Sequence, residues 1–438
     1  GSSPGRIILG NVLRAGFDPD RVTVVKPGVD AIDGVRCVAD LASVPDGRVD
    51  LLIVAVGATQ VPDVVAEVCR DRRAESMILI PGGLGETAGS GDRATRIAAA
   101  IASARASAWG GPVVNGGNCL GIRSRSGRYD TLFIPDPKRP PPSRDRSPLA
   151  VLSQSGAFGI TVASRLGPAQ PELLVTFGNQ SDLTVGDWME HVERDPDLRV
   201  IACYVEGFRP GDGRRWLASA RRCVEQGRTV ILYLAGRTRA GAGAAASHTA
   251  SIAGDWATTR SLAAGAGALV PDELETFHDL VRTFTLLAGR APRGTRLGAM
   301  SNAGFECVAI ADGSDAFRLA TFSRETEQRL RAMFCEHRLE GIVDIRNPLD
   351  VTPIANDRGF AFAAEAILED PGVDAAVLGC VPLSGALETL PAGEGHREDV
   401  RSDRSVAAGM LRAFHASDKP CVAIVDAGPT YDLSRIHI

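Results

Sequence analysis

The chain has 438 residues, of which 44% are hydrophobic and 23% are charged, and its formal net charge is −5. That length exceeds the roughly 100 to 200 residues of an ordinary domain, so we expect three domains. The spread-out Arg residues and negative charge argue against a nucleic-acid partner, and no apolar run reaches the about 18 residues that would suggest a membrane span.

Short β-branched runs alternate along the chain with longer Ala-, Arg- and Glu-rich stretches of helical period. This alternation predicts parallel βαβ units and therefore an α/β fold. The predicted strands are residues 22–25, 51–56, 77–80, 149–152, 200–205, 230–234 and 297–300.

Two breaks interrupt this pattern, a proline-rich stretch at 136–144 and a Gly/Arg/Pro stretch at 289–294. They predict three domains, at 1–145, 146–290 and 291–438. The third segment begins as the second does, with an apolar strand that runs into a turn of small residues, so the two segments are candidate structural repeats.

The predicted strand at 149–152 runs through Ser153, Ser155 and Gly156 into a predicted helix. Such a turn points backbone N–H groups toward one place, and we expect the hydroxyls of Ser153 and Ser155 to point there too. An anion such as phosphate would suit that place, although many strand–turn–helix units only connect elements.

A candidate phosphoryl acceptor follows the predicted strand at 230–234. His248, flanked by Ser247 and Thr249, lies in a run of small residues that we expect to form an exposed loop. A histidine that accepts a phosphoryl group needs one free ring nitrogen, nearby N–H groups for the phosphate and a partner that orients the ring. The alternative is that His248 only caps a neighbouring helix.

Glu206 is the candidate for the orienting partner. It follows the predicted strand at 200–205, and parallel sheets place functional groups at strand ends. A carboxylate on one imidazole nitrogen fixes the tautomer and stabilises the charge that develops on the ring. The alternative is an ordinary surface glutamate in a turn.

Five stretches together resemble the α part of the ADP-forming (NDP-forming) acyl-CoA synthetases, which are relatives of succinyl-CoA synthetase. The resemblance covers essentially the whole chain and is densest from 110 to 255. The matching stretches are residues 118–122 (NCLGI), 152–157 (LSQSGA), 177–182 (FGNQSD), 205–207 (VEG) and 247–254 (SHTASIAG).

The resemblance implies a Rossmann-like CoA-binding domain followed by two flavodoxin-like, doubly wound domains. It also implies the reaction carboxylate + CoA + NTP ⇌ acyl-CoA + NDP + phosphate, in which an acyl phosphate passes its phosphoryl group to His248. Ser153, Ser155, Gly156, Ser247 and Thr249 would then contact the phosphate.

Coenzyme A would be held mainly by the first domain, where Lys26 could meet its phosphates. Cys119 would be a packed residue at the edge of the active site rather than a nucleophile, because no histidine lies near it in sequence. The residues that the resemblance implies for CoA are Gly1, Ser2, Ser3, Lys26, Val56, Gly82, Gly83, Asn118 and Cys119.

The chain departs from the family pattern at Gly57, Ala250 and Phe305, where proline, glycine and glycine are usual, and it lacks a lysine before the histidine segment. These changes could alter loop conformation or activity. After residue 290 we recognise no ATP-grasp module, so ATP or ADP and Mg²⁺ would be bound by a separate β subunit or by a C-terminal domain beyond residue 438. We expect a carboxylic acid or acyl-CoA as substrate and a dimer or higher oligomer.

Nine cysteines, an odd number with no CxxC pair, fit neither a disulfide framework nor a zinc site. Together with the absence of a secretion signal, they lead us to expect a cytoplasmic protein with no metal site of its own and no membrane partner.

Two other functions remain open at this stage. The first is a non-catalytic module that senses CoA or acyl-CoA, such as the regulatory part of a protein acyltransferase. The second is a NAD(P)-linked oxidoreductase, which is disfavoured because Lys26 stands where an acidic ribose-binding residue belongs and no GxGxxG is visible.

Overall fold

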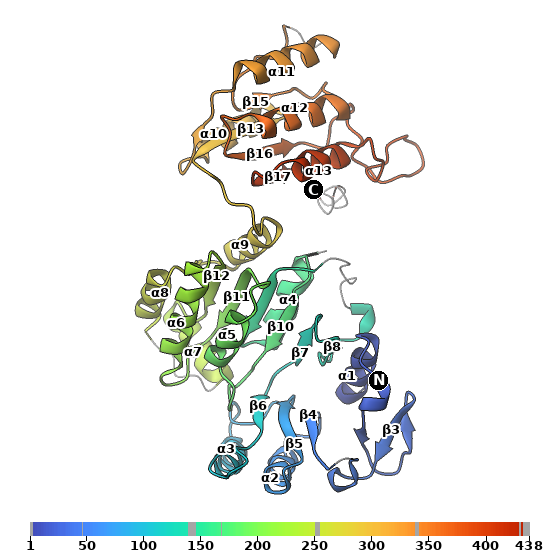
Figure 1. The fold of residues 1–438 in the computed structure, drawn as a ribbon, viewed down its shortest axis with the longest axis vertical. Coiled ribbons are helices and arrows are strands. Elements are labelled where there is room, and N and C mark those ends of the chain that lie inside the picture. The colour runs from blue at the N-terminus through green and yellow to red at the C-terminus, as the bar shows by residue number, and fades with distance from the viewer. Residues whose placement is uncertain are drawn as a thin grey trace. The chain divides into compact units, whose positions relative to one another are not determined.

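The computed structural model describes residues 3–45, 47–138, 146–167, 169–249, 255–337, 341–428 and 431, without the side chains of 246–249. The chain forms two compact units, Gly1–Ala288 and Gly289–Ile438 (Figure 1). None of the described helices is long and apolar enough to cross a membrane. The further division at residue 145 stays a prediction.

The first part of unit 1 contains two small sheets. Among the described strands, β4, β5 and β6 form a parallel sheet, and β3 lies between β1 and β2 in the other. The side chains of helices α2 and α3 form a core with one face of β4–β6. The elements are α1 (Pro4–Arg14), β1 (Val24–Val25), β2 (Ala31–Ile32), β3 (Val35–Val38), β4 (Val49–Val54), α2 (Val61–Asp71), β5 (Ala74–Leu79), α3 (Gly91–Arg105) and β6 (Val113–Gly116), with 3₁₀ helices η1 (Pro19–Arg21) and η2 (Leu41–Ser43).

The second part of unit 1 is one larger sheet in the order β12-β11-β9-β10-β7-β8, as far as its strands are described. β9 to β12 are parallel, whereas β7 and β8 form an antiparallel hairpin at the β10 edge. The elements are β7 (Ile122–Ser124), β8 (Tyr129–Asp130), η3 (Asp136–Lys138), β9 (Leu149–Ser153), α4 (Gly156–Arg165), β10 (Leu173–Thr176), α5 (Val185–Glu193), β11 (Val200–Val205), α6 (Asp212–Glu225), β12 (Thr229–Leu234), α7 (Arg239–Thr249), α8 (Trp256–Gly265) and α9 (Leu274–Leu286).

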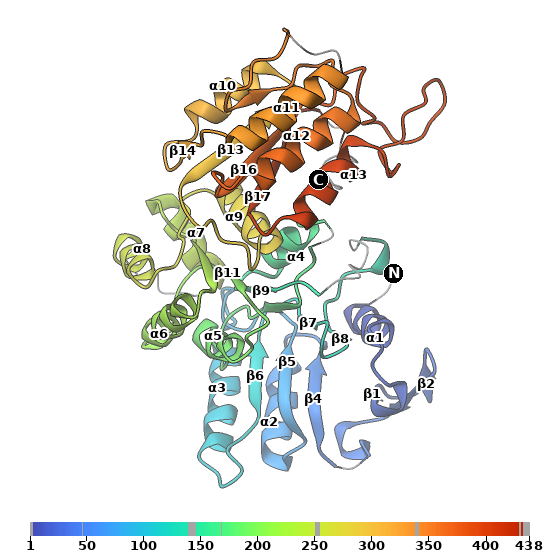
Figure 2. The same ribbon diagram turned by 45° about the horizontal axis from the view of Figure 1, so that its top comes forward.

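Both faces of this sheet are buried, which explains why its central strands read as continuous apolar runs. Along β11, Ile201 and Cys203 face a core built with α5 and α6, while Val200 and Ala202 face a core built with α4 and α9. Figure 2 shows α5 and α6 side by side on their face of the sheet. The α/β class predicted from the sequence is confirmed.

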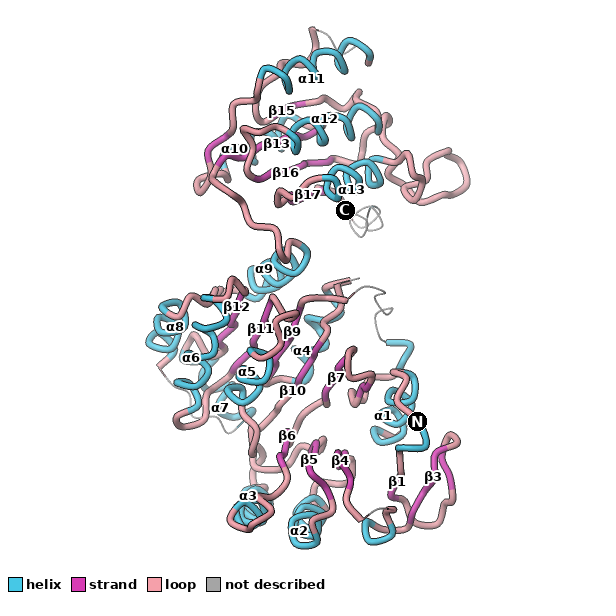
Figure 3. Tube along the Cα trace, viewed as in Figure 1, coloured by secondary structure: helices cyan, strands magenta, loops and turns pink. Residues whose placement is uncertain are grey.

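Unit 2 has a parallel sheet in the order β14-β13-β16-β17, with β15 beside β13. The strand order β14-β13-β16-β17 repeats the order β10-β9-β11-β12 of the larger sheet in unit 1. In both rows the strand that comes first in the sequence, β13 or β9, lies inside the sheet, next to the strand that follows it. The elements are β13 (Arg296–Ser301), α10 (Gly304–Asp312), β14 (Arg318–Leu319), α11 (Arg324–Glu336), β15 (Leu349–Asp350), α12 (Asp357–Glu369), β16 (Ala375–Cys380), α13 (Val406–Ala416) and β17 (Cys421–Val425). Figure 3 shows the long loop between β16 and α13 that carries no helix or strand.

The segment expected to be an exposed loop around His248 is instead helical in its backbone. α7 runs from Arg239 to Thr249 and includes Gly241 and Gly243. The high helix propensity of the alanines at 240, 242 and 244–246 offsets the low propensity of the two glycines. The expectation of a loop was therefore wrong for these residues. Ala250 and residues 251–254 lie outside the described residues.

Candidate functional site

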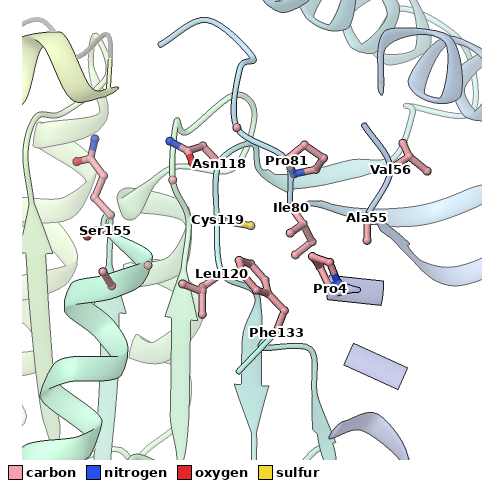
Figure 4. A pocket seen from close by; sticks show the side chains of 15 residues that line it. Pro4, Ala55, Val56, Ile80, Pro81, Asn118, Cys119, Leu120, Phe133 and Ser155 are labelled. Carbon is pink, nitrogen blue, oxygen red and sulfur yellow. The ribbon is translucent and has the colours of Figure 1, made fainter. Parts of the chain in front are cut away.

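A pocket of about 440 Å³ lies in unit 1 where α1, the ends of β4 and β5, and the start of α4 meet. Figure 4 shows its lining side chains, which come from segments far apart in the sequence. The lining residues are Pro4, Ala55, Val56, Ile80, Pro81, Gly82, Asn118, Cys119, Leu120, Phe133, Gln154, Ser155, Gly156, Ala157 and Gly178.

The pocket brings together six residues predicted from the sequence. Val56, Gly82, Asn118 and Cys119, expected for CoA, share it with Ser155 and Gly156, expected for phosphate. These residues follow the carboxyl ends of parallel strands or start the next helix, which is where α/β folds place ligands.

Two helices begin at this pocket. Pro4 is the first residue of α1, and Ser155 is the N-cap of α4, where its Oγ accepts a hydrogen bond of 3.3 Å from the Phe158 N–H. Helix N-termini carry partial positive charge and attract anions. The pocket therefore offers anion sites without using charged side chains.

Gly82 leaves room that a larger residue would fill. A Cβ at Gly82 would lie 3.0 Å from Glu86 Oε1 and 3.1 Å from Asn118 Oδ1. Glu86 holds the backbone around it, because its carboxylate accepts hydrogen bonds from the N–H groups of Gly83 and Leu84 and from Asn179 Nδ2. Burial alone would raise the pKa of Glu86, but these hydrogen bonds outweigh it and lower that pKa below its usual value.

Cys119 lines the pocket but is a packed thiol. It is buried, its Sγ donates to the Leu79 carbonyl at 3.3 Å, and burial raises its pKa to about 12. Such a thiol is poorly nucleophilic at neutral pH.

Ser153 is placed differently from what the sequence suggested. Its hydroxyl is buried and donates 2.6 Å to the carbonyl of Ser155, so it stabilises the turn instead of pointing to an open anion site. The expectation for its hydroxyl was wrong because turns of this kind supply their own acceptor.

Glu206 lies just beyond the end of β11, and its side chain is only 8% exposed. Its Oε1 accepts a hydrogen bond of 3.2 Å from the Tyr204 hydroxyl, while its buried Oε2 has no partner among the described residues. The Glu206 N–H donates 2.8 Å to Oε1 of Gln154, a residue that lines the pocket. Gln154 therefore connects the pocket to the backbone of Glu206.

Tyr204 is held in a stack of aromatic rings. Its ring centroid lies 4.1 Å from that of Phe158 and 5.9 Å from that of Tyr233. Burial first, and then the adjacent Glu206 carboxylate, raise the pKa of Tyr204, so its hydroxyl remains a donor.

β11 and β12 also bring Glu206 near the entry to the histidine segment. Tyr204 pairs with Tyr233 and Val205 with Leu234, so both strands end at one edge, and the chain leaves β12 there toward α7. The side chains of Ser247, His248 and Thr249 lie outside the described residues, so their predicted roles stay predictions.

Other predicted CoA residues do not line this pocket. Lys26 is exposed after β1, where its N–H donates 2.8 Å to the Val38 carbonyl, and Gly83 is held by Glu86. Ser3 is the N-cap of α1, and Gly1 and Ser2 lie outside the described residues. Their roles also stay predictions.

Sequence reasoning missed several lining residues. Gln154 and Gly178 stand inside the stretches that carry the family resemblance, so a signal for them existed. Phe133 has no such signal, because it reaches the pocket only after the β7–β8 hairpin joins the larger sheet.

Comparison with known proteins agrees with this architecture. Residues 1–125 match the CoA-binding domain family, and residues 146–284 match the succinyl-CoA ligase like flavodoxin domain family. The predicted Rossmann-like and flavodoxin-like fold is thereby confirmed.

Among individual proteins, the chain is 29% identical over 428 residues to the acetate–CoA ligase [ADP-forming] II subunit alpha of Pyrococcus furiosus, covering 95% of this chain and 87% of that protein. It is 29% identical over 400 residues to acetate–CoA ligase [ADP-forming] I of Archaeoglobus fulgidus, covering 90% of this chain but only 55% of that longer protein.

A solved structure is similar over nearly the whole chain. The dinucleotide forming acetyl-coenzyme A synthetase 1 of Ca. Korarchaeum cryptofilum, in complex with phosphate and ADP, has a TM-score of 0.81 at 26% identity and covers 99% of this chain and 86% of its own. The chain is therefore similar over nearly its whole length to NDP-forming acyl-CoA synthetases, as a chain of the α-subunit type.

Proposed function

We propose that this chain is the CoA-binding, phosphohistidine-carrying part of an acyl-CoA synthetase, with His248 as the residue that is transiently phosphorylated. The observation that carries the proposal is the Glu206 carboxylate, which is buried and, among the described residues, is held by Tyr204 at one oxygen only. A buried carboxylate oxygen needs a partner, and an imidazole N–H is a suitable one.

The first step would take place in the pocket at the start of α4. An oxygen of phosphate attacks the carbonyl carbon of the acyl-CoA thioester, a C–O bond forms, and the C–S bond breaks. The CoA sulfur leaves and takes up a proton, and an acyl phosphate remains. The N–H groups at the start of α4 stabilise the phosphate charge there.

In the second step a ring nitrogen of His248 attacks the phosphorus of the acyl phosphate. An N–P bond forms, the P–O bond to the acyl group breaks, and the carboxylate leaves. The other ring nitrogen keeps its proton and donates it in a hydrogen bond to Glu206, which stabilises the positive imidazole.

The phosphoryl group then passes from His248 to a nucleoside diphosphate, which regenerates the neutral histidine. We propose that a β-type ATP-grasp subunit or domain binds that nucleotide and its Mg²⁺. The relative from Pyrococcus furiosus, described as a subunit alpha, supports a two-part enzyme, and the longer relative from Archaeoglobus fulgidus supports a fused one.

Phosphorylation of the chain tests the proposal directly. The purified chain is incubated with acetyl phosphate, or with acetyl-CoA and phosphate, and examined by intact mass for a phosphate that is labile to acid and stable to base. We expect label on the parent chain, none on His248→Ala, reduced label on Glu206→Gln, and full label on His191→Ala, a control in which an exposed histidine of α5 is removed.

A CoA-sensing module predicts a different result. In that case the chain binds CoA in a direct binding assay, yet no donor, including ATP with Mg²⁺ and an ATP-grasp β subunit, places phosphate on His248. That result would overturn the phosphohistidine proposal and favour the sensing function.

A further inference from the structure

One wall of the pocket in unit 1 is made of apolar side chains, which would make no hydrogen bonds to phosphate or to the polar groups of CoA. Leu120 and Phe133 line it beside Ile80 and Pro4 (Figure 4). We propose that Leu120 and Phe133 form the acyl-binding wall, and that this site selects monocarboxylic acids with an apolar tail large enough to touch both side chains.

Leu120 is fixed directly against the proposed phosphate site. The N–H groups of Leu120 and Gly121 both donate to Thr176 Oγ1, at 2.8 and 3.0 Å. A Cβ at Gly156 would lie only 2.7 Å from Leu120 Cδ1, so the leucine packs against the first residue of α4. A phosphoryl group at the start of α4 would therefore place the attached acyl carbon next to Leu120.

Phe133 is fixed from another direction. Asn11 of α1 is fully buried, and its Nδ2 donates to the carbonyl of Leu132 and, at 3.1 Å, to that of Ile134. Leu132 and Ile134 belong to the core beside α4, while Phe133 packs on the other side of this extended segment. Leu120 is thus held by its own backbone and Phe133 by the backbones of its two neighbours, and a pocket with well-held walls discriminates ligands by shape.

The lack of charged side chains in the pocket lining also favours monocarboxylic acids. Among the described residues that line the pocket, the polar side chains are neutral and none is charged. A second carboxylate on the acid would lose water and would meet no cationic side chain in this lining, which is unfavourable in a partly buried site. We therefore expect dicarboxylic acids to be rejected.

This inference rests on the proposed function but can fail separately from it. Binding to the purified chain is measured by calorimetry for CoA, acetyl-CoA, phenylacetyl-CoA and succinyl-CoA. We expect phenylacetyl-CoA to bind more tightly than CoA or acetyl-CoA, and succinyl-CoA to bind more weakly than acetyl-CoA.

The variant Phe133→Ala should weaken phenylacetyl-CoA binding about fivefold to tenfold, because the ring loses apolar contact, and should leave the Kd for CoA unchanged. Phe133→Leu, which keeps an apolar side chain and so protects folding, should show a smaller loss in the same direction. Val56→Ala is the matched control, since it lies on the CoA side of the pocket and should weaken all four ligands equally.

An equal loss for every ligand in the Phe133 variants would overturn the acyl-binding wall and assign Phe133 to the CoA arm. Tight binding of succinyl-CoA would overturn the selection against dicarboxylic acids. Failure of the proposed function looks different, because His248 then stays unlabelled whatever the thioester preference is.

Discussion

At the residue scale, the site depends on residues that are held by partners 2 to 52 positions away in the sequence. Glu206 receives one hydrogen bond from Tyr204 and anchors its own N–H on Gln154. Because Tyr204 and Glu206 are two positions apart along an extended segment, their side chains emerge on the same side of the sheet. The tyrosine is therefore a positioning residue for the carboxylate rather than a residue that touches the reacting atoms.

Removal of the Tyr204 hydroxyl should slow phosphohistidine formation. Tyr204→Phe keeps the aromatic stack but removes a hydrogen bond to a carboxylate, which contributes on the order of 1.5 kcal/mol and corresponds to about a tenfold change in rate. Quenched-flow labelling of the chain with acetyl phosphate measures that rate. Tyr233→Phe, in the neighbouring ring, is the control and should retain the parent rate; equal losses in both variants would show that the Tyr204 hydroxyl has no special role in holding Glu206.

Cys119 should be inert although it lines the pocket. Burial raises the pKa of Cys119 to about 12, so the thiol stays protonated at pH 8. Iodoacetamide at pH 8 followed by peptide mass spectrometry should modify exposed Cys335 long before Cys119. Rapid alkylation of Cys119 in the folded chain would contradict the packed arrangement.

At the scale of elements, helix α9 is tied to α4 by a polar cluster on the face opposite α5 and α6. Arg165 of α4 pairs with Glu275 at 2.9 Å, and its guanidinium also lies 2.8 Å from Nδ1 of buried His278. The arginine can only donate, so Nδ1 accepts and the proton of the neutral ring lies on Nε2. Burial, and then the charge of Arg165, lower the pKa of His278.

This histidine makes the stability of unit 1 depend on pH. Since its pKa is lowered in the folded state, the unfolded chain binds the proton more readily, and stability falls as pH drops through about 6.5. Urea unfolding at pH 8, 7, 6 and 5.5 should show this loss, and His278→Gln should show a shallower loss. His191→Gln, on exposed surface, should keep the parent profile; identical profiles in the parent and His278→Gln would refute the assignment.

At the scale of the whole molecule, the chain is built from two compact units that each have their own sheets and cores. The segment that joins them is exposed from Ala291 to Thr295, but Arg290 is not free. The Arg290 guanidinium donates 2.8 Å to the Phe414 carbonyl and lies 3.8 Å from the centre of the Phe414 ring. Arg290 is therefore part of unit 2, and the accessible peptide begins after it.

Limited trypsin digestion should distinguish the two arginines of this segment. Cleavage after Arg293 should precede cleavage after Arg290, because proteases cut where the backbone and side chain are exposed and unbonded. Mass spectrometry of the early fragments provides the measurement. Phe414→Ala should remove the ring contact and increase cleavage at Arg290; preferential cleavage at Arg290 in the parent chain would contradict the anchoring.

Periodicity and local motifs in the sequence were sufficient for the α/β class, the main strands and two residues of the pocket, Ser155 and Gly156. These features depend on interactions between near neighbours: buried parallel strands need continuous apolar runs, and strand–turn–helix units need small residues at the turn. The other four predicted pocket residues, Val56, Gly82, Asn118 and Cys119, came from the resemblance to a known family. The helical backbone through His248 was missed because the glycines were given more weight than the surrounding alanines.

Tertiary structure alone decided what surrounds those motifs. Nothing near Phe133 in sequence indicates the pocket, because its position depends on the hairpin β7–β8 joining β10 and on Asn11 holding its backbone. The Tyr204 hydrogen bond, the internal bond of Ser153 and the anchoring of Arg290 likewise depend on which partner is within reach after folding. A sequence determines which groups are able to donate, accept or pack, whereas the packing of distant segments determines which of those groups meet.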